Sequence, residues 1–325
     1  MWLPYQADHV EFARWCGETL EWLTYLNKEA KLPLNPALKS NLPVESNAYH
    51  VALVDCMSYE ATSEIAADRD TWKHVLKTPA KKISVSTLPF VPSNVVDCVV
   101  LPFLPLVTTG LHLQRLRKEL YSTGRVKFIL DEDIRSIEDA ARRYHADAIV
   151  NCTGLGARKL LQDPAVHPVR GCLLTLELPQ DVKDKLKNKI FMFDDNPEGL
   201  TYILPREDAC FVGGTYLPNE WDTTVSEEEE HTILTRAAKV VPELKQGKVV
   251  RKRAGLRPGR AQIRLELDPS FDRLPSYGKY APHTKVFHNY GHGGSGWTVH
   301  WGCAQSVAKL VTDALSSVSS PQAKL

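Results

Sequence analysis

The 325-residue sequence has almost no net charge. Its 40 Lys and Arg residues nearly balance its 39 Asp and Glu residues, which gives a formal charge of +1. Surfaces that bind nucleic acid or anionic membranes carry an excess of basic residues, so the composition disfavours both partners. No apolar run reaches the length of a transmembrane helix, and the first residues, MWLPYQADHVEF, do not follow the pattern of a signal peptide. With 43% hydrophobic residues, the composition is that of an ordinary globular protein.

The seven cysteines include no C-x-x-C pair. They are odd in number and scattered between positions 16 and 303. This spacing favours reduced, mostly buried thiols of an intracellular protein over a disulfide framework or a zinc site.

What is present is an alternation of helical and strand patterns. Apolar periodicity predicts one helix in the first 30 residues and others at 110–124, 134–145, 226–241 and from 297 onward. Short apolar runs predict strands at 49–56, 125–130, 146–152, 170–178, 189–194, 200–205, 209–217 and 285–288. Because 146–152 is nearly all apolar, we expect a strand buried on both faces in a parallel sheet. The order of elements suggests domains made of non-contiguous pieces.

Gly291, Gly293 and Gly296 have the G-x-G-x-x-G spacing of a dinucleotide fingerprint. Only 29 residues follow Gly296, and most of them form one helical pattern, so no βαβ unit fits there. Two interpretations remain: a turn that binds an electron-rich ligand at a helix N-terminus, or a tight structural turn. Ser295 as a nucleophile, or the histidines around it as metal ligands, are weaker alternatives, because neither matches the known spacing.

Three other places could carry chemistry. Gly154 and Gly156 follow an expected strand, where ligands bind in parallel sheets, although a close-packed turn explains them equally well. Arg257 lies beside Pro258 in an expected rigid turn, where a guanidinium suits a carboxylate, whereas Arg260 and Arg264 are expected to be solvated. Tyr202 and Tyr216, expected on strands, are either core residues or face the same cavity as Arg257.

Five motifs together indicate a family. They are IVNCTGLGARKL, VRGCLLTLEL, YILPRED, GLRPGRAQIRLE and VFHNYGHGGSGWTVHWGCA. Their order and spacing resemble those of D-amino-acid oxidases, from residue 2 to the last helix. The resemblance implies an α/β fold in which a Rossmann-like FAD-binding domain of the p-hydroxybenzoate-hydroxylase type is interleaved with a mixed-sheet substrate domain. We expect the FAD-binding domain at 101–170 and 254–325, and the substrate domain at 5–100 and 171–253.

The resemblance also implies an activity, the oxidative deamination of D-amino acids to 2-oxo acids, ammonia and hydrogen peroxide by hydride transfer to flavin N5. The substrate-binding residues would be Arg257, Tyr202, Tyr216 and Gly294, with Arg257 and Tyr202 catalytic and no metal. The implied FAD-binding residues are Gly291, Gly293, Gly294, Ser295, Gly296, Trp297, Thr298, Thr153 and Gly154. Positioning would do most of the catalytic work.

Aspartate-specific relatives usually carry an arginine where Tyr216 stands here. A tyrosine therefore favours neutral D-amino acids, with a D-aspartate oxidase as the alternative. The sequence also begins after the first strand and G-x-G-x-x-G turn with which the family holds the FAD pyrophosphate. We therefore expect weak FAD binding and poor folding of these 325 residues alone, and a catalytically inactive remnant is a further alternative.

The C-terminal residues Ala323-Lys324-Leu325 are a conservative variant of the Ser-Lys-Leu peroxisomal signal. This ending predicts a peroxisomal protein bound by the import receptor, and otherwise a cytoplasmic one. The other expected partners are a D-amino acid, oxygen and, in a possible homodimer, a second copy of the chain.

Overall fold

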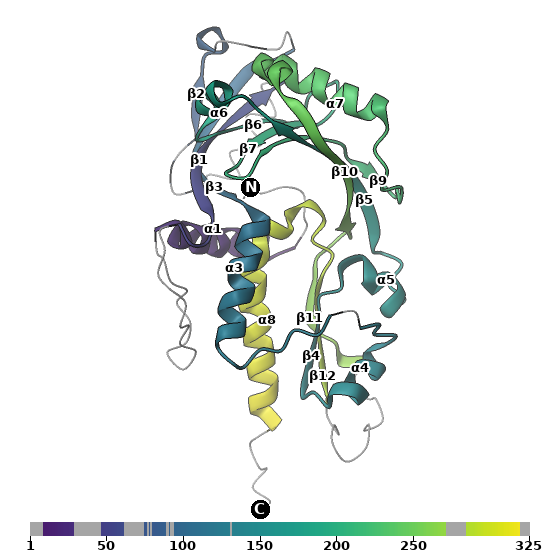
Figure 1. Ribbon diagram of the computed structural model, residues 1–325. Helices are drawn as coiled ribbons and strands as arrows, with labels where there is room; N and C mark the ends of the chain where they lie inside the picture. Colours follow the sequence, from purple (N-terminus) through teal and green to yellow (C-terminus); the bar gives the residue numbers. More distant parts are fainter. Residues whose placement is uncertain are drawn as a thin grey trace, which may run out of the picture. The chain divides into compact units, whose positions relative to one another are not determined.

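Figure 1 shows the computed structural model of the chain. It describes residues 9–28, 47–61, 75–76, 78, 80–88, 91, 94–130, 132–270 and 284–318. Contacts divide the chain into two compact units. Among the described residues, unit 1 is drawn from 20–128 and 170–256, and unit 2 from 9–19, 129–169 and 257–318.

The units are non-contiguous in sequence. Their breaks after Val169 and after Leu256 lie within a few residues of the expected domain boundaries. Two segments are grouped differently from that expectation: 101–128 falls in unit 1, and Tyr5–Thr19 falls in unit 2. The assignment of one unit to the cofactor and the other to the substrate stays a prediction.

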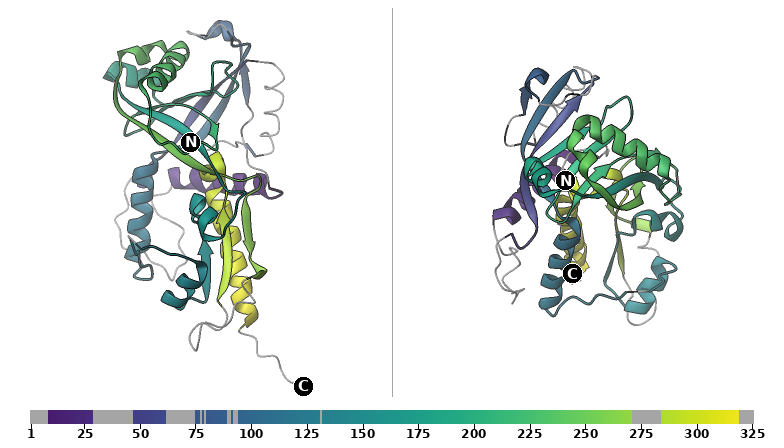
Figure 2. Two further views of the ribbon diagram at one scale, coloured as in Figure 1. Left: turned by 90° about the vertical axis from the view of Figure 1, so that its right-hand side faces the viewer. Right: turned by 45° about the horizontal axis from the view of Figure 1, so that its top comes forward.

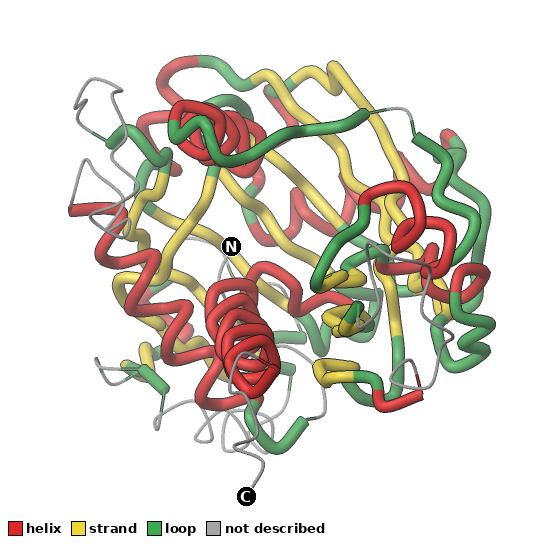
Figure 3. The backbone as a smooth tube through the Cα atoms, turned by 90° about the horizontal axis from the view of Figure 1, so that it is seen from below, coloured by secondary structure: helices red, strands yellow, loops and turns green. Residues whose placement is uncertain are grey.

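Unit 1 is built around a nine-stranded mixed sheet with the strand order β10-β5-β8-β7-β6-β1-β3-β2, and β9 pairs with β5. The strands are β1 (Val51–Glu60), β2 (Lys81–Ile83), β3 (Asp97–Val107), β5 (His167–Glu177), β6 (Lys189–Phe193), β7 (Thr201–Pro205), β8 (Cys210–Gly213), β9 (Leu217–Pro218) and β10 (Lys248–Gly259). The β1–β6 pair is parallel, whereas the β1–β3, β6–β7 and β7–β8 pairs are antiparallel. Figure 3 shows these strands side by side.

Helices α6 (Gln180–Leu186) and α7 (Glu227–Val240) pack on this sheet (Figures 1 and 2). Val182 of α6 and Ile233 of α7 join Leu174 and Ile203 of the strands in one buried apolar cluster. Burial of such side chains is the main favourable term in folding. Unit 1 therefore has a core of its own.

The start of α7 is capped as its sequence predicts. The Ser226 side chain accepts a hydrogen bond from the Glu229 backbone N–H, and the Glu229 side chain accepts one from the Ser226 N–H. Arg170, 3% exposed on β5, donates to both carboxylate oxygens of Glu229 and to the carbonyls of Asp222 and Thr224. The helix N-terminus and the preceding loop are thus held by one buried guanidinium.

Unit 2 contains a three-stranded sheet with the order β11-β12-β4. Its strands are β11 (Arg264–Leu267), β12 (Lys285–Tyr290) and β4 (Ala148–Asn151). The β12–β4 pair is parallel and the β11–β12 pair is antiparallel. Helix α8 (Gly296–Val318) runs along this sheet (Figures 1 and 2).

Most expected elements are confirmed. The remaining α-helices among the described residues are α1 (Phe12–Lys28), α3 (Thr109–Ser122), α4 (Ile137–Tyr144) and the short α5 (Ala157–Leu160), which follows a 3-10 turn. All seven cysteines are free thiols, and only Cys152 is exposed. Among the described residues, no helix is long and apolar enough to cross a membrane.

Two expectations were wrong. Residues 125–130 form no strand, and Phe128, Ile129 and Leu130 are 37%, 42% and 62% exposed. An extended segment becomes a strand only when a neighbour takes up its backbone hydrogen bonds, and none of the described strands does so here. Strand β4 is not buried on both faces either, since Val150 is 41% exposed and β4 lies at one edge of its sheet.

Candidate functional site

Two glycine turns leave the same edge of the unit 2 sheet. In the parallel pair, Lys285–His288 of β12 align with Ala148–Asn151 of β4, so the two strands end side by side. Beyond these ends lie the turns at 153–156 and 291–296. The carboxyl edge of parallel strands is where ligands bind in open α/β sheets. The structure thus brings together the two separate groups of residues expected to bind the cofactor.

The backbone of these turns requires glycine. Gly154, Gly291 and Gly293 have φ values of 56°, 84° and 53°, a region that other L-residues rarely adopt. A Cβ added at Gly291 would lie 2.8 Å from Cβ of Arg260, whereas one at Gly293 would meet nothing within 4 Å. Gly294 is exposed and Ser295 is buried, and α8 begins at Gly296.

Arg257 lies on β10, not in the rigid turn that the sequence suggested. Its neighbour Pro258 has side-chain carbons 3.6 Å from the position that a Cβ of Gly154 would take. The last residues of β10 therefore lie beside the 153–156 turn, all within unit 2. Arg257 is half-buried.

The expectation that Arg260 and Arg264 are solvated was wrong. Arg260 donates to Asp163 at 3.1 Å, and Arg264 donates to Asp268 at 3.0 Å and to the Tyr290 hydroxyl at 2.9 Å. The Tyr290 hydroxyl in turn donates to Asp163 at 2.8 Å. Short-range spacing gives no sign of the Asp163 partner of Arg260, because the two lie 97 residues apart.

Tyr202 and Tyr216 belong to unit 1. Tyr202 lies on β7 and packs so closely on two glycines that a Cβ at Gly213 would be 2.2 Å from its Cζ, and one at Gly214 would be 2.6 Å from its Cε1. Arg236, which is buried, donates to the Gly214 carbonyl at 2.8 Å. Tyr216 was expected on a strand, but it lies between β8 and β9 and is 43% exposed.

The weaker alternatives gain no support. Ser295 Oγ accepts no hydrogen bond from and donates none to any described residue, so no base activates it as a nucleophile. The histidines around the glycine turn form no cluster among the described residues: His300 Nδ1 contacts the Trp297 carbonyl, and burial lowers the pKa of His292 to about 4.

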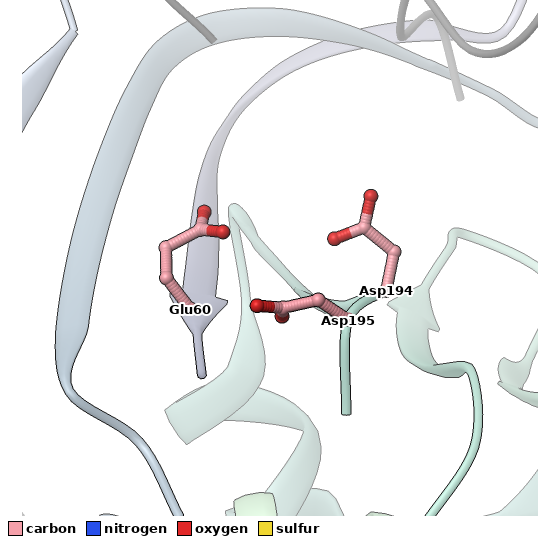
Figure 4. A group of neighbouring side chains, drawn as sticks. All are labelled: Glu60, Asp194 and Asp195. Carbon is pink, nitrogen blue, oxygen red and sulfur yellow. The ribbon is translucent and has the colours of Figure 1, made fainter. Parts of the chain in front are cut away.

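One acidic cluster occurs among the described residues of unit 1. Carboxylate oxygens of Glu60, Asp194 and Asp195 lie within 4.8 Å of one another (Figure 4). Glu60 is fully buried, and Asp195 accepts a hydrogen bond from the Ala61 N–H at 2.7 Å. Such groups occur commonly in proteins without an ion, so we assign no metal to it.

Comparison with known proteins places the chain in a family. The DAO family, described as FAD dependent oxidoreductase, matches residues 2–310. The chain belongs to this family of FAD-dependent oxidoreductases.

Two relatives carry narrower names. The chain is 41% identical over 184 residues to a D-amino-acid oxidase of Rubrobacter xylanophilus, a match that covers 57% of this chain and 51% of the relative. It is 34% identical over 188 residues to the D-aspartate oxidase of Homo sapiens, covering 58% of this chain and 50% of that protein. The chain thus spans about half the length of the curated relatives it matches.

Among solved structures, glycine oxidase from Geobacillus kaustophilus superposes with a TM-score of 0.67 over 95% of this chain and 81% of that protein. The sequence identity is 17%, so the likeness shows the fold alone. The α/β fold expected from the sequence, a Rossmann-like FAD-binding domain interleaved with a mixed sheet, is confirmed.

The residues of the two glycine turns fit the FAD of this family. Ser295 Oγ is fully buried without a hydrogen-bond partner among the described residues, which leaves a donor for a ligand oxygen or nitrogen. The first turn of α8, a 23-residue helix, presents backbone N–H groups and partial positive charge at the same place. Thr153 and Gly154 lie on the neighbouring turn.

Sequence reasoning missed the side chains behind these turns. Asn151, at the end of β4, accepts hydrogen bonds from both the backbone N–H and the hydroxyl of Thr153. His288, its register partner on β12, contacts Asn151 and Asp268. A polar residue ending an apolar strand, as in IVNCTG, is the only signal that could have pointed to Asn151.

Proposed function

We propose that this chain acts in the FAD-dependent oxidation of D-amino acids to 2-oxo acids. The observation that carries the proposal is the pair of glycine turns at one sheet edge, with the buried Ser295 hydroxyl and the N-terminus of α8 between them. The likeness to a D-amino-acid oxidase at 41% identity supports the substrate class. FAD, when bound, would accept the hydride from the substrate α-carbon and pass the electrons to oxygen, with hydrogen peroxide as product.

The N-terminus of α8 has a definite electrostatic role in this proposal. Unpaired N–H groups in the first turn of a helix stabilise negative charge. Placed at the ring system of the cofactor, they would favour its reduced, more negative form. Gly293 and Gly294, which precede this first turn, carry no side chains that would block a ligand from approaching its N–H groups.

Arg257 is the proposed partner of the substrate carboxylate. A planar guanidinium donates two parallel hydrogen bonds to a carboxylate, and the half-buried position limits competition from water. Tyr202 is proposed to donate its hydroxyl to the substrate as well. The free amine of the substrate supplies its own electron pair, so no side chain is assigned as a base.

Replacing Arg257 tests this role. Two hydrogen bonds to a charged group contribute roughly 1.5 to 3 kcal/mol each, so Arg257→Ala should raise KM for a D-amino acid by about a hundredfold or more. Arg253→Ala, an exposed arginine of the same strand, is the matched control and should leave KM within about twofold. Equal KM values for both variants would remove Arg257 from the site.

We propose a preference for neutral D-amino acids, because the exposed Tyr216 carries no charge to pair with a second carboxylate. A panel of D-alanine, D-methionine and D-aspartate, scored by peroxide release, tests it. Tyr216→Arg should shift the kcat/KM ratio towards D-aspartate. A wild-type preference for D-aspartate would instead favour the second candidate, a D-aspartate oxidase, to which the 34% identity with the human enzyme points.

A catalytically inactive family member that binds D-amino acids is the third candidate. The visible spectrum of the purified protein separates it from an oxidase. An oxidase should take up FAD and show a flavin spectrum, whereas the inactive form should show none.

We also propose peroxisomal import through Ala323-Lys324-Leu325, which lies outside the described residues. The release of hydrogen peroxide supports this location chemically. A fluorescent protein ending in the last ten residues should enter peroxisomes, and deletion of Leu325 should leave it in the cytoplasm. Diffuse fluorescence of the intact reporter would contradict the proposal.

A further inference from the structure

A line of three buried side chains ends at the 153–156 turn. We propose that Asp268, His288 and Asn151 form a directional hydrogen-bond relay that positions this turn for the cofactor. The inference rests on the proposed role of Thr153 and Gly154 in holding FAD. It makes Asn151 and His288 positioning residues, which act through the turn and do not themselves touch the cofactor.

The relay is continuous and lies wholly in unit 2. His288 Nε2 lies 2.8 Å from Asp268 Oδ2, and His288 Nδ1 lies 3.4 Å from Asn151 Nδ2. Asn151 Oδ1 accepts hydrogen bonds from the Thr153 N–H at 3.1 Å and from the Thr153 hydroxyl at 2.8 Å. His288 is fully buried and Asn151 is 3% exposed, so water does not compete for these contacts.

A single assignment of the protons satisfies the contacts of His288 with Asp268 and Asn151 and those of Asn151 with Thr153. The Asp268 carboxylate, which also accepts from Arg264 and from Ser270, needs a donor at His288 Nε2. A neutral imidazole protonated at Nε2 is an acceptor at Nδ1, so Asn151 must present its amide N–H₂ to the ring. The amide oxygen of Asn151 then faces Thr153, where two donors converge. Each member of the relay fixes the orientation of the next.

Burial keeps His288 neutral at physiological pH. Burial is the largest influence and lowers the pKa of His288, while the Asp268 carboxylate raises it and Arg264 lowers it. Glu266, the register partner of His288 on β11, is a further charged neighbour and also raises the pKa of His288. Asn151 faces the ring from β4, and the Tyr290 ring lies edge-on at 5.6 Å.

Protonation of His288 would reverse the relay. Nδ1 then becomes a donor, the Asn151 amide has to rotate to meet it, and Thr153 loses its acceptor. Because burial lowers the pKa of His288, the turn of the wild-type protein should loosen only as pH falls through that lowered pKa, below the ordinary imidazole value of about 6.5. The dissociation constant for FAD should rise over the same range.

Asn151→Asp is predicted to invert this pH dependence. The new carboxylate still accepts from Thr153 but cannot donate to His288. Either neutral form of the ring then leaves one nitrogen lone pair facing a carboxylate, whereas the doubly protonated ring donates to both. We expect FAD binding about tenfold weaker than wild type at pH 8.5, with the gap closing as pH falls to 6. A purely structural role of Asn151 would weaken binding at every pH.

Asn289→Asp is the matched control. It adds the same charge one residue from His288, but successive side chains of a strand point to opposite faces. It should keep the wild-type direction of pH dependence. FAD dissociation constants are measured by quenching of flavin fluorescence on the full chain between pH 5.5 and 8.5.

Two measurements need no cofactor. Ring-nitrogen NMR of the wild-type chain should show His288 protonated at Nε2 alone at pH 7.5, with His288→Gln used to assign the signal. After correction for the intrinsic pH dependence of amide exchange, the protection of the Thr153 amide should fall at low pH in the wild type and rise in Asn151→Asp. If the variant does not fold, the wild-type measurements still decide the matter.

A wild-type His288 protonated at Nδ1 at pH 7.5, or unchanged protection of the Thr153 amide across the pH range in which His288 titrates, would overturn the relay. The same direction of pH dependence in wild type and Asn151→Asp would overturn it as well. Absence of FAD binding together with the expected NMR and exchange results would instead refute the proposed cofactor role of the turn and leave the relay standing.

Discussion

At the residue scale, the position of Tyr202 depends on two neighbours without side chains. The ring lies where a Cβ of Gly213 or Gly214 would otherwise stand, and Arg236 holds the Gly214 carbonyl behind it. The Tyr202 hydroxyl is therefore placed by backbone contact, which leaves little freedom for the ring. A residue proposed to hold a substrate gains from such preorganisation, because less entropy is lost on binding.

Gly213→Ala should displace the Tyr202 ring, because the added Cβ would lie 2.4 Å from its hydroxyl oxygen. We expect KM for a D-amino acid to rise by about tenfold, the loss of one hydrogen bond to a charged group. Gly110→Ala in α3 is the control, since nothing lies within 4 Å of the added carbon, and it should leave KM unchanged. An unchanged KM in Gly213→Ala would separate Tyr202 from substrate binding.

Single residues were predictable where the local backbone conformation requires a particular residue type. The glycines at 154, 291 and 293 have backbone angles that only glycine readily adopts, and the motifs containing them were recognised. The Asp163 partner of Arg260 and the partners of His288 were not predictable. They come from other elements, and Asn151 and His288 lie 137 residues apart in sequence.

At the scale of elements, α7 combines local and distant stabilisation. Its capping box has the sequence pattern S-x-x-E, but the same Glu229 also forms an ion pair with the buried Arg170 of β5. Four glutamates in the first turn lie at the positive end of the helix dipole. The helix start is thus held by a residue of the sheet that the helix covers.

Ser226→Ala should lower the free energy of unfolding by about 1 kcal/mol, the usual cost of a lost N-cap. Urea denaturation at pH 7 measures it. Ser86→Ala, which alters an exposed hydroxyl pair outside any α-helix, should change the stability by less than about 0.5 kcal/mol. Equal effects of the two substitutions would refute the importance of the cap.

Glu229 should also make stability depend on pH. Hydrogen bonds from Arg170 outweigh burial and lower the pKa of Glu229 to about 2, below its ordinary value of 4.5. Its contribution is therefore complete above pH 4.5 and is lost as pH falls towards 2. Glu229→Gln, which leaves a buried guanidinium without its carboxylate, should cost several kcal/mol at pH 7, roughly 3 to 5.

The difference in unfolding free energy between wild type and Glu229→Gln should shrink as pH falls from 4.5 to 2. Urea titrations at a series of pH values follow it. Glu228→Gln, which alters an exposed neighbour in the same helical turn, should differ from the wild type in unfolding free energy by the same small amount at every pH. A constant gap for Glu229→Gln across this range would contradict the assignment.

Elements were predictable where periodicity and burial agree. Helices α4 and α7 and the strands β5 to β8 lie within a few residues of their expected positions. The segment 125–130 has an apolar pattern but no strand beside it, and a pattern alone does not supply a partner. Strand pairing depends on the whole sheet, so the pattern of a short segment cannot predict whether that segment pairs.

At the scale of the whole molecule, the order of elements predicted that compact units would be made from separate parts of the sequence. The breaks after Val169 and Leu256 lie close to two of the expected boundaries. The grouping of 101–128 with unit 1 was not foreseen, because β3 pairs with β1 and β2 and thereby joins the larger sheet. Here long-range pairing outweighed the local alternation of strand and helix.

The proposed function divides between the units in a simple way. The two glycine turns, the relay behind them and Arg257 belong to unit 2, whereas Tyr202 and Tyr216 belong to unit 1. The cofactor contacts should therefore depend on unit 2 alone. Substitutions at Tyr202 or Tyr216 should alter KM without weakening FAD binding, and a loss of FAD in Tyr216→Phe would contradict this division.

The central claim is that FAD held at the two glycine turns is reduced by D-amino acids. The most direct measurement mixes the FAD-loaded protein with D-alanine or L-alanine in the absence of oxygen and follows the visible flavin absorption. We predict that the absorption bleaches with D-alanine, persists with L-alanine and returns when oxygen is admitted. A protein that binds FAD but keeps its oxidised spectrum with every D-amino acid tried would contradict the claim.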